Sequence, residues 1–325
     1  MKNSKFLKAA LLFFGLFILI MFLFSIDLNQ LKAGINQLDI FSVSIVLLLT
    51  FVNVFVKAYR WQFLVRRITK QKISLPFSFS SIIAGVAAGS FTPGRGGEIA
   101  KPLMLKARHG IRVSKSLPGI IIERMFDLAA LMALFFFALI YVPKNAIYTQ
   151  AVIGFSIMIV LLFVLLIIAP EKMFTMISFV LNKSPIPKNF KEKLDSILTE
   201  FFKGFKILRS KKATTTISIL SLLSMILEVV RLYFLFMIFG IPISIILTTF
   251  SFTASIIFGT LTMIPGGIGT TEISQAAIIN NIVRVTNLDF LKDAILVDRF
   301  ISYYLLIILG ALILMLMKHE KKTLK

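Results

Sequence analysis

Cysteine is absent from this chain, histidine occurs only twice, and acidic residues are scarce. The lack of cysteine excludes disulfides, thiol chemistry and cysteine-ligated metals. Both histidines, His109 and His319, lie in basic stretches. We therefore expect neither a metal site nor a cofactor.

Charged residues as a class are also rare. They make up 16% of the chain, against about 25% in soluble domains, while 58% of the residues are hydrophobic and the mean hydropathy is +0.91. Apolar runs of the ~20 residues that cross a bilayer recur along the whole length. The short alternating segments of outer-membrane barrels are missing. The composition predicts an all-α polytopic membrane protein.

We expect six transmembrane helices and two interrupted apolar segments. The expected spans are 6–24, 40–58, 117–141, 146–169, 213–239 and 295–317. The interrupted segments cover about 76–105 and 243–283, and a Pro-Gly-rich motif breaks each one near its middle. The first run exceeds the apolar core of a signal peptide, and no small-residue cleavage site follows it, so we expect it to be retained.

The basic residues predict the topology. The formal net charge is +21, which on a soluble protein would suggest nucleic acid. In a membrane protein, Lys and Arg collect in cytoplasmic loops. They concentrate here at both termini and in 57–75, 101–115 and 170–212. We therefore expect a cell-membrane protein with both termini in the cytoplasm and no nucleic-acid partner. Segment 76–105 would then enter and leave from the cytoplasm, and 243–283 from outside.

The two motifs indicate an internal repeat. They read "SFTPGRGGE", ending at Glu98, and "MIPGGIGTTE", ending at Glu272. An acid-Arg pair follows each motif at nearly equal spacing. The chain divides into three spans plus one re-entrant helical hairpin, used twice, as repeat 1 (1–141) and repeat 2 (142–317). Opposed hairpins predict an inverted repeat with a substrate site between the halves, although two glycine turns can also be alike by chance.

Ionisable residues at membrane depth are candidates for that site. Such groups cost several kcal/mol unless they pair or face water. The candidate substrate-binding residues are Gly94, Arg95, Gly96, Gly97, Glu98, Glu123, Arg124, Asp127, Glu228, Arg231, Gly266, Gly267, Gly269, Glu272, Asp298 and Arg299. The spacing of Arg124 from Asp127, and of Glu228 from Arg231, places each pair on one helix face. The alternative is that these residues only join helices to one another.

The motifs suit a phosphate group. Glycines allow a tight turn with accessible backbone N–H groups. A helix that begins just after each turn, at about Ile99 or Thr271, points its positive end into the interior. With arginines nearby, that end favours an anion. We expect the arginines to hold the phosphate and the motif glutamates to orient the arginines, to bind a cationic headgroup or to carry a proton. "GRGGE" lacks the context of a nucleotide-binding motif.

Two features lie outside the motifs. Residues 188–209 have the pattern of an amphipathic helix, with apolar side chains on one face and basic side chains on the other. This helix is expected either to lie on anionic lipid or to pack under the bundle. Trp61 stands beside Arg60 and Tyr59, as an interfacial anchor would.

A family resemblance appears at these residues. "GSFTPGRGGEIAKPLML" with "ERMFDLAAL", followed by "IPGGIGTTE" with "VDRFISYYLL", resembles the flippase-like membrane domain family. That family is also called the lysylphosphatidylglycerol synthase transmembrane region. In its aminoacyl-phosphatidylglycerol enzymes a similar region moves the lipid product between leaflets and precedes a soluble transferase domain. Because this sequence ends at Lys325, we expect that domain, and synthase activity, to be absent.

Three functions remain open at this stage. The first is a lipid translocator for an anionic phospholipid or a polyprenyl-phosphate-linked lipid, with the headgroup in a central polar cavity. The second is a membrane-embedded glycolipid or phospholipid transferase that uses Glu98, Glu123 and Asp127, although no acidic DxD motif is present. The third is a non-catalytic membrane partner of a separate lipid-modifying enzyme, with the basic stretch 188–212 as the docking site.

Overall fold

The computed structural model describes residues 39–142, 154, 157, 197–262, 264–283 and 288–323. Every regular element among these residues is a helix, which confirms the all-helical class. Two expected spans, 6–24 and 146–169, lie outside the described residues apart from two isolated helical positions. The amphipathic stretch is described only from residue 197.

The first part of the described chain contains four helices and one tight turn. They are α3 (Ile40–Thr69), α4 (Leu75–Ser90), the 3-10 turn η1 (Pro93–Ile99), α5 (Ala100–His109) and α6 (Val113–Leu139). The first motif thus forms a 3-10 turn between α4 and α5. Helix α3 continues past the expected end at residue 58 to Thr69, and of the arginines in this extension Arg60 is buried whereas Arg66 and Arg67 are exposed.

The second part repeats this order. Residues 197–204 are helical and lead into η2 (Phe205–Arg209). The elements that follow are α10 (Lys211–Ile238), α11 (Ile245–Leu261), the 3-10 turn η3 (Pro265–Gly267), α12 (Thr270–Val283), α13 (Leu288–Arg299), the π-helix η4 (Phe300–Tyr304) and α14 (Leu305–Thr323). The second motif forms the turn between α11 and α12.

Three of the described helical stretches are long and apolar enough to cross a membrane: Ile40–Thr69, Lys211–Ile238 and Leu288–Met317. The third stretch combines α13, η4 and α14 into one run. Helix α6 is also long, but Glu123, Arg124 and Asp127 interrupt its apolar character. Helices α4 and α11 are apolar and shorter.

Matching N-caps begin the long helix and the short helix of each part. Asp39 caps α3 and Ser210 caps α10, each by accepting a hydrogen bond from a backbone N–H three residues later. Ser74 caps α4 and Ser244 caps α11 in the same way. Short polar side chains at these positions satisfy N–H groups that have no partner within the helix. The local sequence therefore sets the same start points twice.

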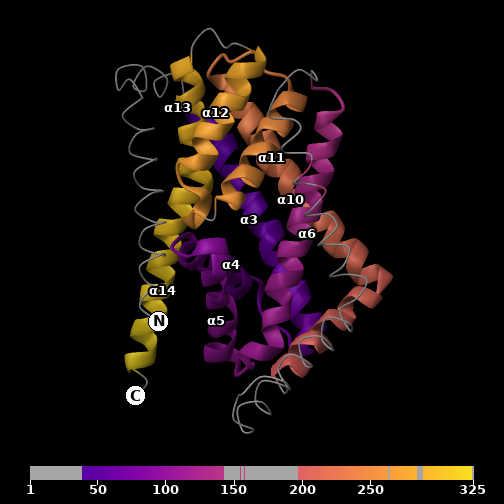
Figure 1. Cartoon of the computed structure of the whole chain (residues 1–325). Helices are drawn as coiled ribbons and strands as arrows, with labels where there is room; N and C mark the ends of the chain where they lie inside the picture. Colours follow the sequence, from indigo (N-terminus) through magenta and orange to yellow (C-terminus); the bar gives the residue numbers. More distant parts are fainter. Residues whose placement is uncertain are drawn as a thin grey trace, which may run out of the picture.

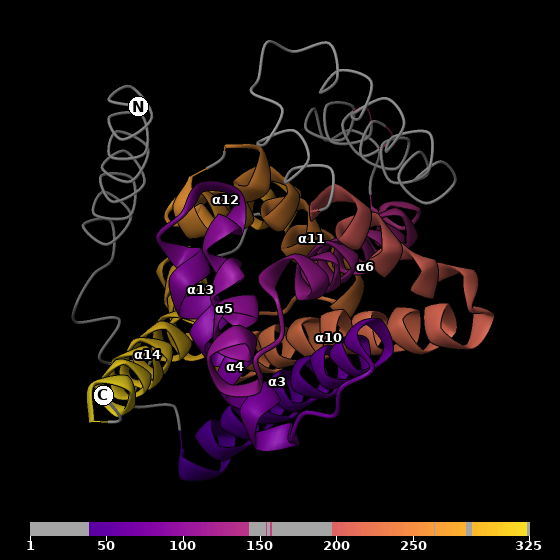
Figure 2. The ribbon, with the colours of Figure 1, turned by 90° about the horizontal axis from the view of Figure 1, so that it is seen from below.

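The two short helical hairpins occupy opposite ends of the molecule. In Figure 1, α4 and α5 lie in the lower half and α11 and α12 in the upper half, with the connecting turns at mid-height. From below, α4 and α5 are enclosed by the longer helices (Figure 2). Helix α14 packs along α4, and Gly310 makes this possible, because a Cβ there would collide with the backbone of Ile83.

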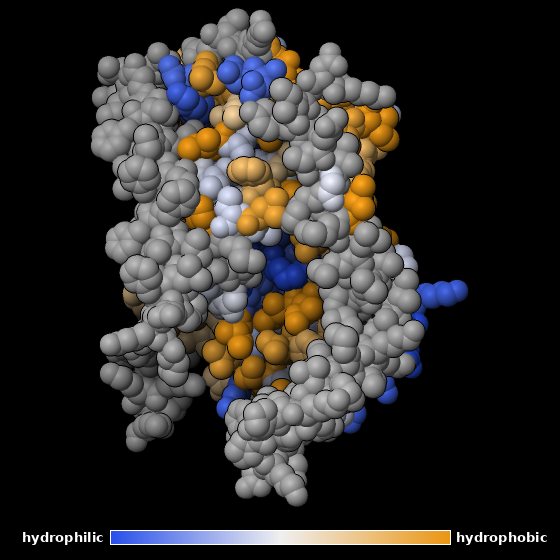
Figure 3. Space-filling view, viewed as in Figure 1, coloured by the Kyte–Doolittle hydropathy of each residue, from blue (hydrophilic) through white to orange (hydrophobic). Residues whose placement is uncertain are grey.

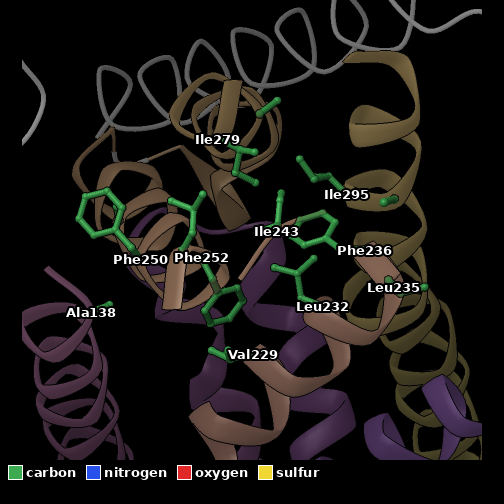
Figure 4. Close-up of a cluster of buried hydrophobic side chains, with 14 of the residues drawn as sticks. Ala138, Val229, Leu232, Leu235, Phe236, Ile243, Phe250, Phe252, Ile279 and Ile295 are labelled. Carbon is green, nitrogen blue, oxygen red and sulfur yellow. The ribbon is translucent and has the colours of Figure 1, made fainter. Parts of the chain in front are cut away.

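Separate apolar clusters hold the two hairpins. The larger cluster joins α6, α10, α11, α12 and α13, with Phe236, Phe250, Phe252 and Ile295 among its members (Figure 4). A second cluster joins α3, α4 and α5, with partly buried side chains of α14 against it. Burial of apolar side chains therefore anchors each hairpin to the helices around it.

The described part of the amphipathic stretch packs against the bundle. Phe205 is buried with Leu64 and Ile122, and Gly204 lies against Pro118. Glu200 accepts hydrogen bonds from Arg112, at 3.3 Å, and from the hydroxyl of Ser114. The basic side chains of Lys203 and Lys206 remain exposed. Of the two expected arrangements, residues 197–209 therefore adopt the one in which the segment packs against the bundle.

Candidate functional site

The two motif turns lie next to each other. η1 and η3 are in direct contact, and the end of α4 also reaches η3. Figure 1 shows both turns at the middle of the molecule, one approached from below and one from above. The helices that follow begin at Ala100 and Thr270, each within one residue of the expected start. Both helix N-termini therefore open toward the same central region.

Gly97 fixes the shape of the first turn. A Cβ at this position would overlap the backbone carbonyl of Ala88 in α4, so only glycine fits. The Gly97 N–H donates to the Thr92 hydroxyl at 2.6 Å, which closes the turn. Gly94 and Gly96 lie in the same turn, and a Cβ on Gly96 would meet nothing within 4 Å.

Arg95 stands at the tip of this turn in a strained conformation. Its φ is 57°, in the left-handed region that few residues other than glycine adopt. The side chain is 45% exposed, and Nη1 is 3.9 Å from Oε1 of Glu98. Backbone strain at a charged, accessible residue is a feature of functional sites.

A buried ion network follows directly after the first turn. Glu98 accepts two hydrogen bonds from the Arg124 guanidinium, at 2.5 and 3.2 Å. Lys101 Nζ lies 3.3 Å from Glu98 and 2.6 Å from Glu123. Arg124 also reaches Asp127, at 3.7 Å, as their spacing predicts. The network joins the start of α5 to α6, so the position of the turn depends on these charges.

Arg60 extends the network into α3. Its guanidinium donates to both carboxylate oxygens of Asp127, at 2.5 and 3.2 Å, and Nε lies 3.5 Å from Glu123. Lys101 Nζ also lies 4.8 Å from the ring centroid of Trp61, within cation–π range. The expectation that Trp61 is an interfacial anchor is wrong, because its side chain is fully buried among these helices.

Three glycines with positive φ shape the second turn: Gly266 (68°), Gly267 (64°) and Gly269 (80°). At Gly266 a Cβ would collide with the hydroxyl of Tyr303, and at Gly267 with the hydroxyl of Thr271. Side chains would thus be excluded both by the backbone conformation and by these hydroxyls.

Ion pairs also follow the second turn. Arg299 Nε lies 3.3 Å from Oε1 of Glu272, and Tyr304 donates a hydrogen bond to the same oxygen at 3.4 Å. Arg231 in α10 donates to both oxygens of Asp298, at 2.8 and 3.3 Å. These contacts join α12 and α10 to the run of α13 and η4.

The partners of Glu228 differ from those that local spacing suggested. Its carboxylate binds Lys57 Nζ at 2.5 Å and the Asn53 amide at 3.0 Å, both in α3. Arg231, three residues further on, pairs with Asp298 instead. The shared helix face is therefore not used for a direct pair, and Glu228 connects α10 to α3.

The two halves repeat one pattern of charges. In each half the motif glutamate pairs with the arginine of the later acid-Arg dipeptide: Glu98 with Arg124, and Glu272 with Arg299. In each half the acid of that dipeptide faces an arginine from the preceding long helix. These contacts are Glu123 with Arg60 and Asp298 with Arg231. The motifs thus correspond in their tertiary partners as well as in sequence.

The arginines differ in how far a ligand can reach them. The Arg95 side chain is 45% exposed and that of Arg124 is 35% exposed. Arg299 is 16% exposed and Arg231 only 2%. Figure 3 shows strongly hydrophilic residues recessed at mid-height, with apolar residues directly below them. The accessible positive charge beside the turns thus belongs to the first half of the chain.

The sequence did not identify Lys57, Arg60 and Lys101 as candidate site residues. The sequence placed them in cytoplasmic loops, because hydropathy treats each cation as exposed. In the structure Arg60 and Lys101 are each 2% exposed and pair with acids distant in the chain. A usable signal was the excess of acids in the following helix, since buried carboxylates require cations.

Known proteins are similar to this chain over most of its length. The family described as the lysylphosphatidylglycerol synthase TM region matches residues 8–310. A UPF0104 membrane protein of Methanothermobacter thermautotrophicus is 31% identical over 87% of this chain and 86% of its own length. Another, from Pyrococcus horikoshii, is 24% identical over 95% and 96%. The resemblance carried by the two motifs is confirmed: this chain belongs to the lysylphosphatidylglycerol synthase TM region family.

Proposed function

We propose that this protein moves an anionic lipid, either a phospholipid or a polyprenyl-phosphate-linked lipid, between the leaflets of the cell membrane. The observation that carries the proposal is the contact between η1 and η3, with buried ion pairs behind each turn. Irregular backbone and charge persist at membrane depth only beside protein or water. A headgroup would lie at the meeting point of the turns while its acyl or prenyl chains stay in lipid.

The inverted repeat is part of this proposal. Support comes from the matched N-caps, the matched pairs of Glu and Arg, and the placement of the two hairpins at opposite ends of the molecule. We assign α4–α5 and α11–α12 as re-entrant hairpins that enter from the cytoplasm and from outside, respectively. Inverted repeats with broken helices at the midplane form the substrate sites of many transporters.

The available charge favours an anionic headgroup. Behind the turns each carboxylate already faces a cation, whereas Arg95 projects beyond Glu98 and is the most exposed of the four arginines near the turns. Arg124 retains exposed surface while it pairs with Glu98. Guanidinium groups bind phosphate through paired N–H donors. Arg95 and Arg124 are therefore our first choices for the phosphate contact.

Reconstitution into liposomes tests the function. The purified protein should scramble fluorescent anionic phospholipids between leaflets, and the rate should fall at least about tenfold, equivalent to ~1.4 kcal/mol, in Arg95→Gln. Arg66→Gln is the matched control, because Arg66 is an exposed cation of α3 away from the turns. Scrambling at the normal rate by Arg95→Gln would refute the proposed role of Arg95. No lipid movement, together with a covalently modified lipid product, would favour the transferase instead.

A further inference from the structure

Three buried polar atoms near the second turn have no hydrogen-bond partner among the described residues. They are Oε2 of Glu272, Nε2 of Gln275 and the hydroxyl of Tyr303. All three residues are at least nine-tenths buried. A buried donor or acceptor without a partner destabilises the folded state, because its hydrogen bonds to water are lost and not replaced. Three such atoms in one region indicate that another molecule completes their hydrogen bonds.

The three residues lie in one region beside the second turn. Glu272 and Gln275 are three residues apart on α12 and share a helix face. The Tyr303 hydroxyl lies against Gly266, so it points at the turn itself. Arg299 connects Glu272 to Tyr303, since its Nε is 3.3 Å from Glu272 and its guanidinium carbon is 5.6 Å from the Tyr303 ring centroid.

The backbone that supports this cluster is unusual. Tyr303 and Tyr304 both lie in the π-helix η4, which separates α13 from α14. Tyr303 faces Gly266, while Tyr304 donates to Glu272. Single π-helical turns within α-helices occur frequently at functional sites. The π-helix therefore contains one of the residues with an unpartnered atom, Tyr303.

The chemistry of the cluster matches hydroxyl groups. Arg299 offsets the charge of Glu272, as Arg231 offsets that of Asp298. What remains is one carboxylate acceptor, one amide donor, and one phenol that both donates and accepts. A hydroxyl group also donates and accepts. An ammonium group would add a positive charge close to Arg299, which an ion-paired cluster disfavours.

We infer that Glu272, Gln275 and Tyr303 form a subsite for the hydroxyl groups of a glycerol, inositol or sugar headgroup. The inference rests on the proposed function, which supplies the lipid phosphate near Arg95. Because η1 and η3 are in contact, the phosphate and the hydroxyl groups would occupy adjoining positions of one headgroup. The first half of the chain would then recognise the charge, and the second half the polyol.

Binding measurements on the full chain test this assignment. The protein would be placed in phosphatidylcholine nanodiscs and titrated with short-chain phosphatidylinositol, phosphatidylglycerol, phosphatidylserine and phosphatidic acid. We expect the two hydroxylated lipids to bind at least about tenfold more tightly than phosphatidic acid, since several hydrogen bonds are gained. Gln275→Leu and Tyr303→Phe should each lower affinity for phosphatidylinositol about 3- to 10-fold while leaving phosphatidic acid unchanged.

Matched controls separate the subsite from folding. Asn281→Leu removes an amide from the same helix, where it is exposed and bonds the Ala277 carbonyl. Tyr59→Phe removes a hydroxyl from an exposed ring of α3. Both should bind every lipid as the parent chain does. Equal binding of hydroxylated lipids and phosphatidic acid would overturn the subsite, as would equal loss of both in the variants.

The scrambling assay distinguishes the subsite from the function on which it rests. Headgroup preference that is lost in Gln275→Leu, in a protein that moves no lipid, would support the subsite and refute translocation. Scrambling without any preference for hydroxylated lipids would support translocation and remove the subsite.

Discussion

Arg231 and Asp298 form a two-point ion pair between α10 and α13, with N–O distances of 2.8 and 3.3 Å. Both residues are almost fully buried. In this arrangement the pair holds two helices together and leaves Arg231 little surface for a ligand. The same pairing of a long helix with the later acid occurs between Arg60 and Glu123, so a comparable contact stabilises each half.

Removal of one partner from this pair should destabilise the protein. Arg231→Met leaves the Asp298 carboxylate buried without its cation, a change that costs about 3–5 kcal/mol. Thermal unfolding in detergent would measure the loss, and Arg95→Gln should unfold within about 0.5 kcal/mol of the parent chain because Arg95 is exposed. The double variant Arg231→Met, Asp298→Leu should recover much of the lost stability, and failure to do so would indicate another role for the pair.

Two glycines of the first turn should respond differently to the same substitution. Gly97→Ala brings a Cβ into the carbonyl of Ala88, so we expect a loss of about 1–3 kcal/mol in unfolding free energy. Gly96→Ala meets no atom within 4 Å and should be close to neutral. Unfolding curves of the two variants, recorded side by side, would show the difference. Equal stability of both variants would contradict the close packing of η1 on α4.

The contact between residues 197–209 and the bundle should depend on pH. A hydrogen bond from the Ser114 hydroxyl, aided by Arg112, lowers the pKa of Glu200 below its ordinary value. A carboxylate whose pKa is lower in the folded state than in the unfolded state stabilises the folded state fully above the unfolded pKa. This stabilisation is lost as the pH falls through the folded pKa. The protection of residues 197–209 against hydrogen exchange, relative to the intrinsic exchange rate at each pH, should therefore fall once the pH drops below the ordinary carboxyl pKa of Glu, about 4.3. Ser114→Ala should shift that change to higher pH, while Ser80→Ala, on an exposed hydroxyl, should not.

Opposite hairpin orientation predicts opposite labelling. The chain has no native cysteine, so single cysteines report their own position. Arg108→Cys, at the end of α5, should react with an impermeant reagent from the cytoplasmic side, and Leu288→Cys, at the start of α13, from outside. Both positions are exposed, and Figure 1 places α5 and α13 toward opposite ends of the molecule. Reaction of both cysteines from one side would rule out the inverted repeat.

The sequence by itself determined the class and the local geometry. Composition and apolar runs gave an all-helical membrane protein, because polar backbone groups in lipid must be satisfied within helices. Serines at 74 and 244 mark the starts of the short helices, and the glycine motifs mark the turns after them. These features depend on neighbouring residues along the chain, so they can be recognised from the sequence without knowledge of the fold.

Tertiary structure alone decided which charges meet. Lys101 and Arg60 read as parts of basic loops, yet both are buried against acids that lie 22 and 67 residues away. Trp61 read as an interfacial residue and is instead covered by Lys101. The cost of burying an ion depends on whether a counter-charge packs beside it. Since that partner comes from a distant helix, the excess of acids in α6 could indicate that cations are needed, but local spacing does not identify which cations pair with them. Gln275 and Tyr303 were likewise not identified, because their surroundings come from other parts of the chain.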